Sequence, residues 1–121
     1  MSGTSQRTVL IVEDEPGVRE LVAAVLEDLG FSSLAVADGQ AGLEILQAAL
    51  PIGLLIADIG LPDMNGLAMV ERARVLRPGL KILFMTGDPE ISGLREPGAE
   101  LISKPFSIDA LAAHVRQMLD N

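Results

Sequence analysis

The sequence predicts an α/β fold: a small, doubly wound parallel sheet of five strands with helices on both faces. Short apolar runs alternate with helical patterns along the whole chain, the order that builds β-α-β units. The apolar runs lack alternating polar residues, as expected of strands covered on both faces. The 121 residues suffice for one domain, and its core must be aliphatic because only 2% of the residues are aromatic.

Five short segments are the predicted strands. Four of them are continuous apolar runs, and the second is more polar, which favours a place at an edge of the sheet. The predicted strands are residues 9–12, 33–36, 54–57, 82–85 and 101–103.

Helical spacing of apolar residues predicts the helices between these strands. Proline suits the first turn of a helix, aspartate the N-cap, and glycine the position after the end. The first three helices are therefore expected from Pro16 to Gly30, from an Asp38 N-cap to about Leu50, and from Gly66 to the Pro78-Gly79 stop.

The last helix has the clearest pattern. Ser107 is its predicted N-cap, and Phe106 and Leu111 are placed to form a hydrophobic staple. The apolar residues of the following turns share one face. His114 lies one position from that face, so it is expected to be partly exposed rather than a phosphoryl donor.

Composition excludes several classes of function. The chain carries 9 Lys and Arg against 17 Asp and Glu, a formal net charge of -8, which disfavours nucleic-acid and anionic membrane partners. The absence of cysteine excludes disulfides and thiolate chemistry. No signal peptide and no apolar run of roughly 18 residues are present. We expect a cytoplasmic protein with a flexible segment at 1–7 and one domain at 8–121.

Polar residues end the predicted strands. Glu13 and Asp14 follow the first, Asp58 the third, Thr86 the fourth and Lys104 the fifth. Because the carboxyl ends of parallel strands share one edge of the sheet, these side chains are expected to converge on one cleft.

Such convergence has a chemical consequence. Neighbouring carboxylates repel one another and raise each other's pKa, and a hard divalent cation relieves the conflict. Mg²⁺ suits the site because it takes one or two carboxylates together with water and phosphate oxygens. With the Lys104 ammonium and the Thr86 hydroxyl, these are the groups needed to attach a phosphoryl group to a carboxylate.

Four motifs lie at the ends of predicted strands: Val12–Glu15, Ile56–Gly66, Met85–Gly87 and Ser103–Phe106. With these motifs in this order, the chain resembles the receiver domain of two-component response regulators. The resemblance extends from about Thr8 to Leu119 and implies the flavodoxin-like strand order 2-1-3-4-5.

The resemblance implies a role for each matching acidic residue. Asp58 stands at the phosphorylated aspartate, and Asp14 at a direct Mg²⁺ ligand. Glu13 matches the acidic residue that assists the metal through water, and the Gly60 carbonyl matches a backbone metal ligand.

Further roles follow from the same resemblance. Thr86 matches the hydroxyl that moves toward the phosphoryl group, Lys104 the lysine that pairs with it, and Pro105 a proline usually preceded by a cis bond. Where many receivers carry Tyr or Phe, this chain has Leu101, which cannot couple to the threonine through a hydroxyl or an aromatic ring.

The segment between Thr86 and Lys104 also departs from the family pattern. It allows at most a short or irregular fourth helix, because Gly93 weakens the interior and Pro97 blocks continuation. We expect the segment Asp88–Pro97 itself to be the element that moves on phosphorylation. This pattern resembles a subgroup of receivers that stand alone or sit on hybrid histidine kinases.

The implied function is a phospho-accepting signalling domain rather than an enzyme with a separate substrate. Its partners would be a histidine kinase or histidine phosphotransfer protein and an unknown downstream protein, with the chain a monomer or weak dimer. A pseudo-receiver remains an alternative. An aspartate phosphatase is disfavoured by Gly60 where a second aspartate is usual, and a flavin or P-loop site by the acidic first loop and the missing Gly-Lys motif.

Overall fold

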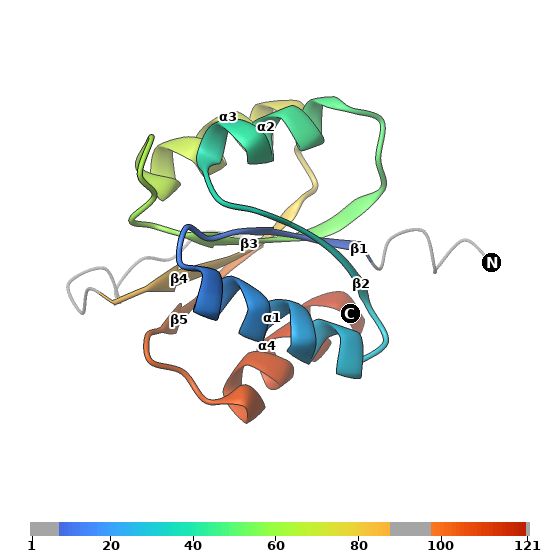
Figure 1. Ribbon diagram of the computed structural model, residues 1–121. Coiled ribbons are helices and arrows are strands. Elements are labelled where there is room, and N and C mark those ends of the chain that lie inside the picture. The colour runs from blue at the N-terminus through green and yellow to red at the C-terminus, as the bar shows by residue number, and fades with distance from the viewer. Residues whose placement is uncertain (1–7, 88–97, 121) are drawn as a thin grey trace.

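The computed structural model is built on a five-stranded parallel sheet in the order β2-β1-β3-β4-β5 (Figure 1). This confirms the predicted fold class and the strand order that the resemblance implied. The structure describes residues 8–87 and 98–120. Its strands are β1 (Thr8–Val12), β2 (Ser32–Val36), β3 (Ile52–Asp58), β4 (Lys81–Thr86) and β5 (Ala99–Ser103).

Helices cover both faces of the sheet. Figure 1 shows α2 and α3 on one face and α1 and α4 on the other. In β1, Leu10 and Val12 belong to the core cluster on the α2/α3 side, whereas Val9 and Ile11 belong to the cluster on the α1/α4 side. Successive strand residues point to opposite faces, so one apolar run supplies both cores. The helices are α1 (Pro16–Asp28), α2 (Gly39–Gln47), α3 (Gly66–Leu76) and α4 (Ile108–Asp120).

Three helix boundaries are set by the local residues that the sequence predicted. The Asp38 carboxylate accepts a hydrogen bond from the Ala41 amide at 2.8 Å, and Ser107 Oγ accepts one from the Ala110 amide at 3.0 Å. Gly30 follows α1 with a φ of 89°, a left-handed conformation that glycine adopts without steric cost. Each of these three helix ends thus follows from one polar or small residue.

The predicted end of the second helix was wrong. Helix α2 stops at Gln47 instead of about Leu50, and Ala48 has extended backbone angles. The Arg77 guanidinium reaches from the end of α3 and donates to the carbonyls of Leu46 at 3.2 Å and Ala48 at 2.7 Å. These bonds satisfy carbonyl groups that a further helical turn would otherwise need to pair.

Two sequence predictions lie outside the described residues. The short helix and mobile element expected at 88–97, and the flexible segment expected at 1–7, are not among them. Within 8–87 and 98–120, no helix is long and apolar enough to cross a membrane.

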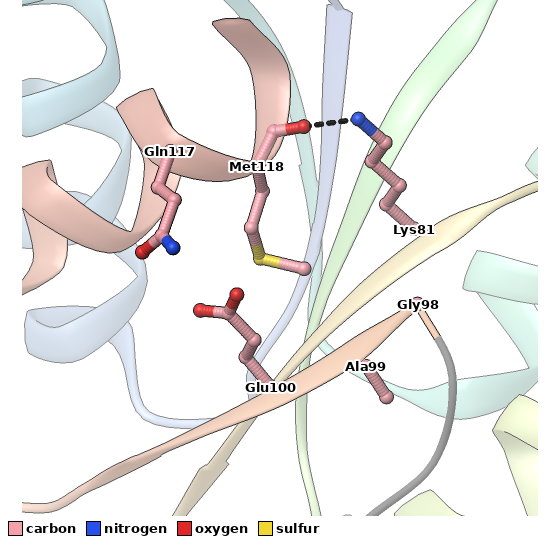
Figure 2. A pocket seen from close by; sticks show the side chains of 6 residues that line it. All are labelled: Lys81, Gly98, Ala99, Glu100, Gln117 and Met118. Atoms are coloured by element: carbon pink, nitrogen blue, oxygen red, sulfur yellow. Dashed lines mark hydrogen bonds between the residues drawn. The ribbon is translucent and has the colours of Figure 1, made fainter. Parts of the chain in front are cut away.

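The amino ends of β4 and β5 form a hollow with the last turns of α4. Figure 2 shows the Lys81 ammonium donating to the main-chain carbonyl of Met118 across this hollow, beside Glu100 and Gln117. The hollow lies at the opposite end of the strands from the polar residues that end them. Lys81 therefore caps the carboxyl end of α4 and holds it against the sheet.

Replacing Lys81 with methionine should lower the free energy of unfolding by about 1 kcal/mol, the usual worth of one such hydrogen bond. Methionine keeps most of the aliphatic length but leaves the Met118 carbonyl without this donor. Urea unfolding followed by circular dichroism measures the loss. The control is Arg116→Met, which removes an exposed cation from α4, the helix that Lys81 caps. An equal loss of stability in both variants would contradict the capping role.

Candidate functional site

The carboxyl ends of β1, β3, β4 and β5 meet at one edge of the sheet. Asp58 is the last residue of β3 and lies in register with Met85 of β4. Just beyond the strands, the Ile59 amide donates to the Met85 carbonyl at 3.0 Å, and the Lys104 amide to the Thr86 carbonyl at 2.7 Å. Parallel pairing therefore brings Asp58, Thr86 and Lys104 to one edge, as the sequence predicted.

Lys104 is the centre of the charge arrangement. Its ammonium lies 2.7 Å from Glu13 Oε1, 3.3 Å from Asp58 Oδ1 and 3.5 Å from Glu15 Oε1. The side chain of Glu13 is fully buried, whereas that of Glu15 is 63% exposed. The Lys104–Glu13 pair is thus the buried ion pair, and Asp58 shares the same ammonium.

Burial and charge shift the pKa values of this pair. Burial raises the pKa of the Glu13 carboxyl and the Asp58 charge raises it further, against the opposing hydrogen bonds from Lys104 and the Glu15 amide. For Lys104, burial disfavours the ammonium, but the hydrogen bond to Glu13 and the charge of Asp58 outweigh it and raise the pKa. The ammonium is therefore the group that permits a buried carboxylate beside Asp58.

Three carboxylates form a cluster of the kind that holds a metal ion. Glu13, Asp14 and Asp58 each offer an oxygen, and these atoms all lie within 4.8 Å of one another. Glu13 and Asp58 are buried, whereas Asp14 is exposed, so the cluster opens to solvent on the Asp14 side. Hard oxygen donors of this number and spacing fit Mg²⁺.

A tight loop carries Gly60 past the end of β3. Gly60 and Asn65 form an antiparallel bridge, and the Gly66 amide donates to the Ile59 carbonyl at 2.7 Å. A Cβ built on Gly60 would lie 3.9 Å from Asp58 Oδ2. The loop therefore brings the Gly60 backbone next to the carboxylate, where the resemblance implies a carbonyl ligand.

The remaining predicted residues lie on or after β4 and β5. Thr86 ends β4 and is buried. The bond between Lys104 and Pro105 is cis, as the resemblance implied. Leu101 is half-buried, pairs with Phe84 and packs against the core cluster on the α2/α3 side. Leucine at this position fills space in the core, and the expectation that it cannot couple to Thr86 through a ring or a hydroxyl stays a prediction.

Several contacts near the site were missed from the sequence. Asp63 accepts hydrogen bonds from the backbone of α2, and the Arg19 guanidinium donates to the Glu13 carbonyl at 2.8 Å. Away from the site, His114 Nδ1 lies 2.6 Å from a Glu100 carboxylate oxygen, so the half-buried histidine pairs with β5. The partners of Asp63 and His114 lie 24 and 14 residues away in the sequence, so no local spacing signals these two contacts.

Comparison with known proteins agrees with this geometry. A family model described as the response regulator receiver domain matches residues 9–116. The chain belongs to this family. In this receiver domain, Asp58, Thr86 and Lys104 lie together because the strands of the family's sheet are parallel.

Relatives of this receiver domain occur in different settings. It is 32% identical to the response regulator receiver protein CpdR of Brucella abortus, covering 93% of this chain and 97% of that protein. It is 33% identical to the probable transcriptional regulatory protein TcrX of Mycobacterium tuberculosis, again over 93% of this chain. The chain spans about half the length of TcrX, with 49% covered.

Solved receiver structures share the fold. The receiver domain from the hybrid histidine kinase CckA is 33% identical, covers 93% of this chain and 98% of that chain, and superposes with a TM-score of 0.80. A CheY-like receiver from Methanospirillum hungatei is 32% identical, with coverages of 96% and 95% and a TM-score of 0.86. The likeness thus includes a domain of a hybrid kinase and a receiver protein of similar length.

Proposed function

We propose that Asp58 accepts a phosphoryl group from a histidine kinase or histidine phosphotransfer protein in a Mg²⁺-dependent reaction. One observation carries this proposal: the Asp58 carboxylate lies 3.3 Å from the Lys104 ammonium and within 4.8 Å of two further carboxylates. A nucleophilic carboxylate, a fixed cation and a metal-binding cluster are the parts that phosphoryl transfer to aspartate requires.

In the proposed reaction, a carboxylate oxygen of Asp58 attacks the phosphorus of a phosphohistidine. An O–P bond forms as the P–N bond breaks, and the imidazole leaves with the electron pair of that bond. The Lys104 ammonium, held by Glu13 at 2.7 Å, is placed to neutralise a phosphoryl oxygen.

Asp14, Asp58 and the Gly60 carbonyl would hold Mg²⁺ directly, with Glu13 acting through water. The bound ion would supply further charge neutralisation for the phosphoryl oxygens. The fit rests on the chemistry of the donors, which are all hard oxygens, and on the exposed side of the cluster at Asp14. That open side leaves room for the phosphoryl donor.

The consequence of phosphorylation would be a change of partner preference. The Thr86 hydroxyl, buried at the end of β4, would respond to the phosphoryl group. The chain would promote only its own phosphorylation and dephosphorylation and would act on a downstream protein. The net charge of -8 supports a protein partner over a nucleic acid or an anionic membrane, in keeping with a cytoplasmic setting and a monomer or weak dimer.

Incubation with acetyl phosphate and Mg²⁺ should add one phosphoryl group, about 80 Da, to the intact mass. Asp58→Asn and removal of Mg²⁺ should each abolish the gain. Asp109→Asn, which changes an exposed aspartate of α4, should retain it.

Beryllium fluoride, which mimics a phosphoryl group on aspartate, gives a second test by nuclear magnetic resonance. With Mg²⁺ it should shift the amide signals around Asp58 and Thr86. If neither acetyl phosphate nor beryllium fluoride had an effect, the phospho-acceptor role would be wrong and a pseudo-receiver would replace it.

A further inference from the structure

Asp63 joins two segments that are remote in sequence. Its Oδ1 accepts from the Gly39 amide and its Oδ2 from the Gln40 amide, both at 2.9 Å. These amides open α2, 24 and 23 residues earlier in the chain. The same two hydrogen bonds lower the pKa of the Asp63 carboxyl, so it stays ionised.

The first turn of α2 has two different aspartates as acceptors. Asp38, the N-cap, accepts a hydrogen bond from the Ala41 amide at 2.8 Å, and Asp63 accepts hydrogen bonds from the Gly39 and Gln40 amides. The first amides of a helix lack partners inside the helix and need outside acceptors. Asp38 directly precedes the helix in the sequence, whereas Asp63 belongs to the loop that follows Asp58.

An apolar contact reinforces the same junction. A Cβ added to Gly39 would lie 2.6 Å from Met64 Cγ and 2.7 Å from Met64 Sδ. The Met64 side chain therefore occupies the space that any larger residue at Gly39 would need. The tip of the loop, Asp63 and Met64, is held to α2 by both hydrogen bonds and packing.

The base of the loop is fixed at the site. The Gly60–Asn65 bridge and the hydrogen bond from the Gly66 amide to the Ile59 carbonyl close it next to Asp58. Gly60 therefore belongs to the base of the loop, which is tied to β3, and the tip that follows it is tied to α2. Loss of the tip contact leaves only the base to fix the direction of the Gly60 carbonyl.

We propose that Asp63 is a positioning residue, which holds the loop 59–65 against α2 so that the Gly60 carbonyl is preorganised for Mg²⁺. The inference rests on the proposed function, since it requires the metal to bind at the carboxylate cluster. Because coupling between two sites is reciprocal, Mg²⁺ binding should also change the surroundings of the Gly39 and Gln40 amides.

The test is a Mg²⁺ titration of the ¹⁵N-labelled chain, followed by nuclear magnetic resonance. In the unchanged protein, the amide signals of Gly39, Gln40 and Gly60 should shift together with one Kd. In Asp63→Ala the Kd should rise about tenfold, as for other residues that orient metal ligands, and Gly39 and Gln40 should no longer respond.

The matched control is Asp38→Ala. It removes an equal charge and a cap from the same helical turn but leaves the loop contact intact, so its Kd should stay within about twofold of the unchanged protein. Asp63→Asn, whose amide oxygen still accepts one hydrogen bond, should have an intermediate Kd. Gly39→Ala, which displaces Met64 without changing charge, should raise the Kd as well.

The outcomes separate the two proposals. If the unchanged chain binds Mg²⁺ and Asp63→Ala binds it equally well, or if Asp38→Ala weakens binding as much as Asp63→Ala, the positioning role is wrong and the phospho-acceptor proposal stands. If the unchanged chain shows no Mg²⁺ response around Asp14 and Asp58, the proposed function fails and the positioning role fails with it.

Discussion

Replacing Gly66 with alanine should destabilise the fold by about 3 kcal/mol, at the upper end of the usual cost of overpacking. A Cβ on Gly66 would lie 2.3 Å from the Asp58 carbonyl oxygen and 2.6 Å from Ile59 Cα. Both are backbone atoms, so no change of rotamer relieves the clash. The loop would have to move away from β3, and with it the Asp58 carboxylate, so phosphorylation by acetyl phosphate should also slow.

Urea unfolding monitored by circular dichroism measures this loss, since the chain has no Trp or Tyr for fluorescence. The matched control is Gly17→Ala in α1, where an added Cβ meets no heavy atom within 4 Å. That variant should gain up to about 1 kcal/mol from reduced freedom of the unfolded chain. Equal stability of the Gly66 variant and the unchanged protein would show that the loop base yields more easily than its contacts indicate.

Replacing Lys104 with methionine should lower the free energy of unfolding by about 3 kcal/mol in metal-free buffer. Removing one member of a buried ion pair leaves the charge of the other without compensation. Glu13 is fully buried, and Asp58 would then lie beside it with no ammonium between them. The pKa of Glu13, already raised, should rise further. The folded state of the variant would then bind more protons than its unfolded state. The difference in unfolding free energy between the variant and the unchanged protein should therefore become smaller as the pH falls from 8 to 5.

Urea unfolding in the presence of a chelator measures the effect, with Lys81→Met as the same substitution at the opposite end of the sheet. The double variant Glu13→Gln with Lys104→Met should recover much of the lost stability, since both members of the ion pair are then uncharged. A deficit that is independent of pH, or that persists fully in the double variant, would contradict the role of the buried Glu13 charge.

The fold and the convergence of the site could be predicted because they depend on local patterns and one topological rule. Each of Asp14, Asp58, Thr86 and Lys104 comes at or just after the end of an apolar run, and parallel strands place such ends at one edge. The buried character of Glu13 was not visible, because Glu13 lies in an acidic run that reads as a solvated surface.

What could not be predicted depends on partners remote in sequence. The end of α2 was misplaced because Arg77, 31 residues after Leu46, satisfies its carbonyls. The role of Asp63 was missed because the amides it accepts from precede it by 24 and 23 residues. Hydrogen bonds of this kind form only after the layers have packed, so propensity and spacing carry no trace of them.

Lys104, whose ammonium balances the carboxylates of the site, comes after all of them in the sequence. Glu13, Asp14 and Asp58 are all made well before Lys104, which follows β5 at the sheet edge. Because chains are synthesised from the amino terminus, a nascent receiver holds its carboxylates without their ammonium until β5 has docked beside β4. Completion of the site is therefore tied to completion of the sheet, and a chain interrupted before Lys104 has Asp58 and the other carboxylates but not their ammonium.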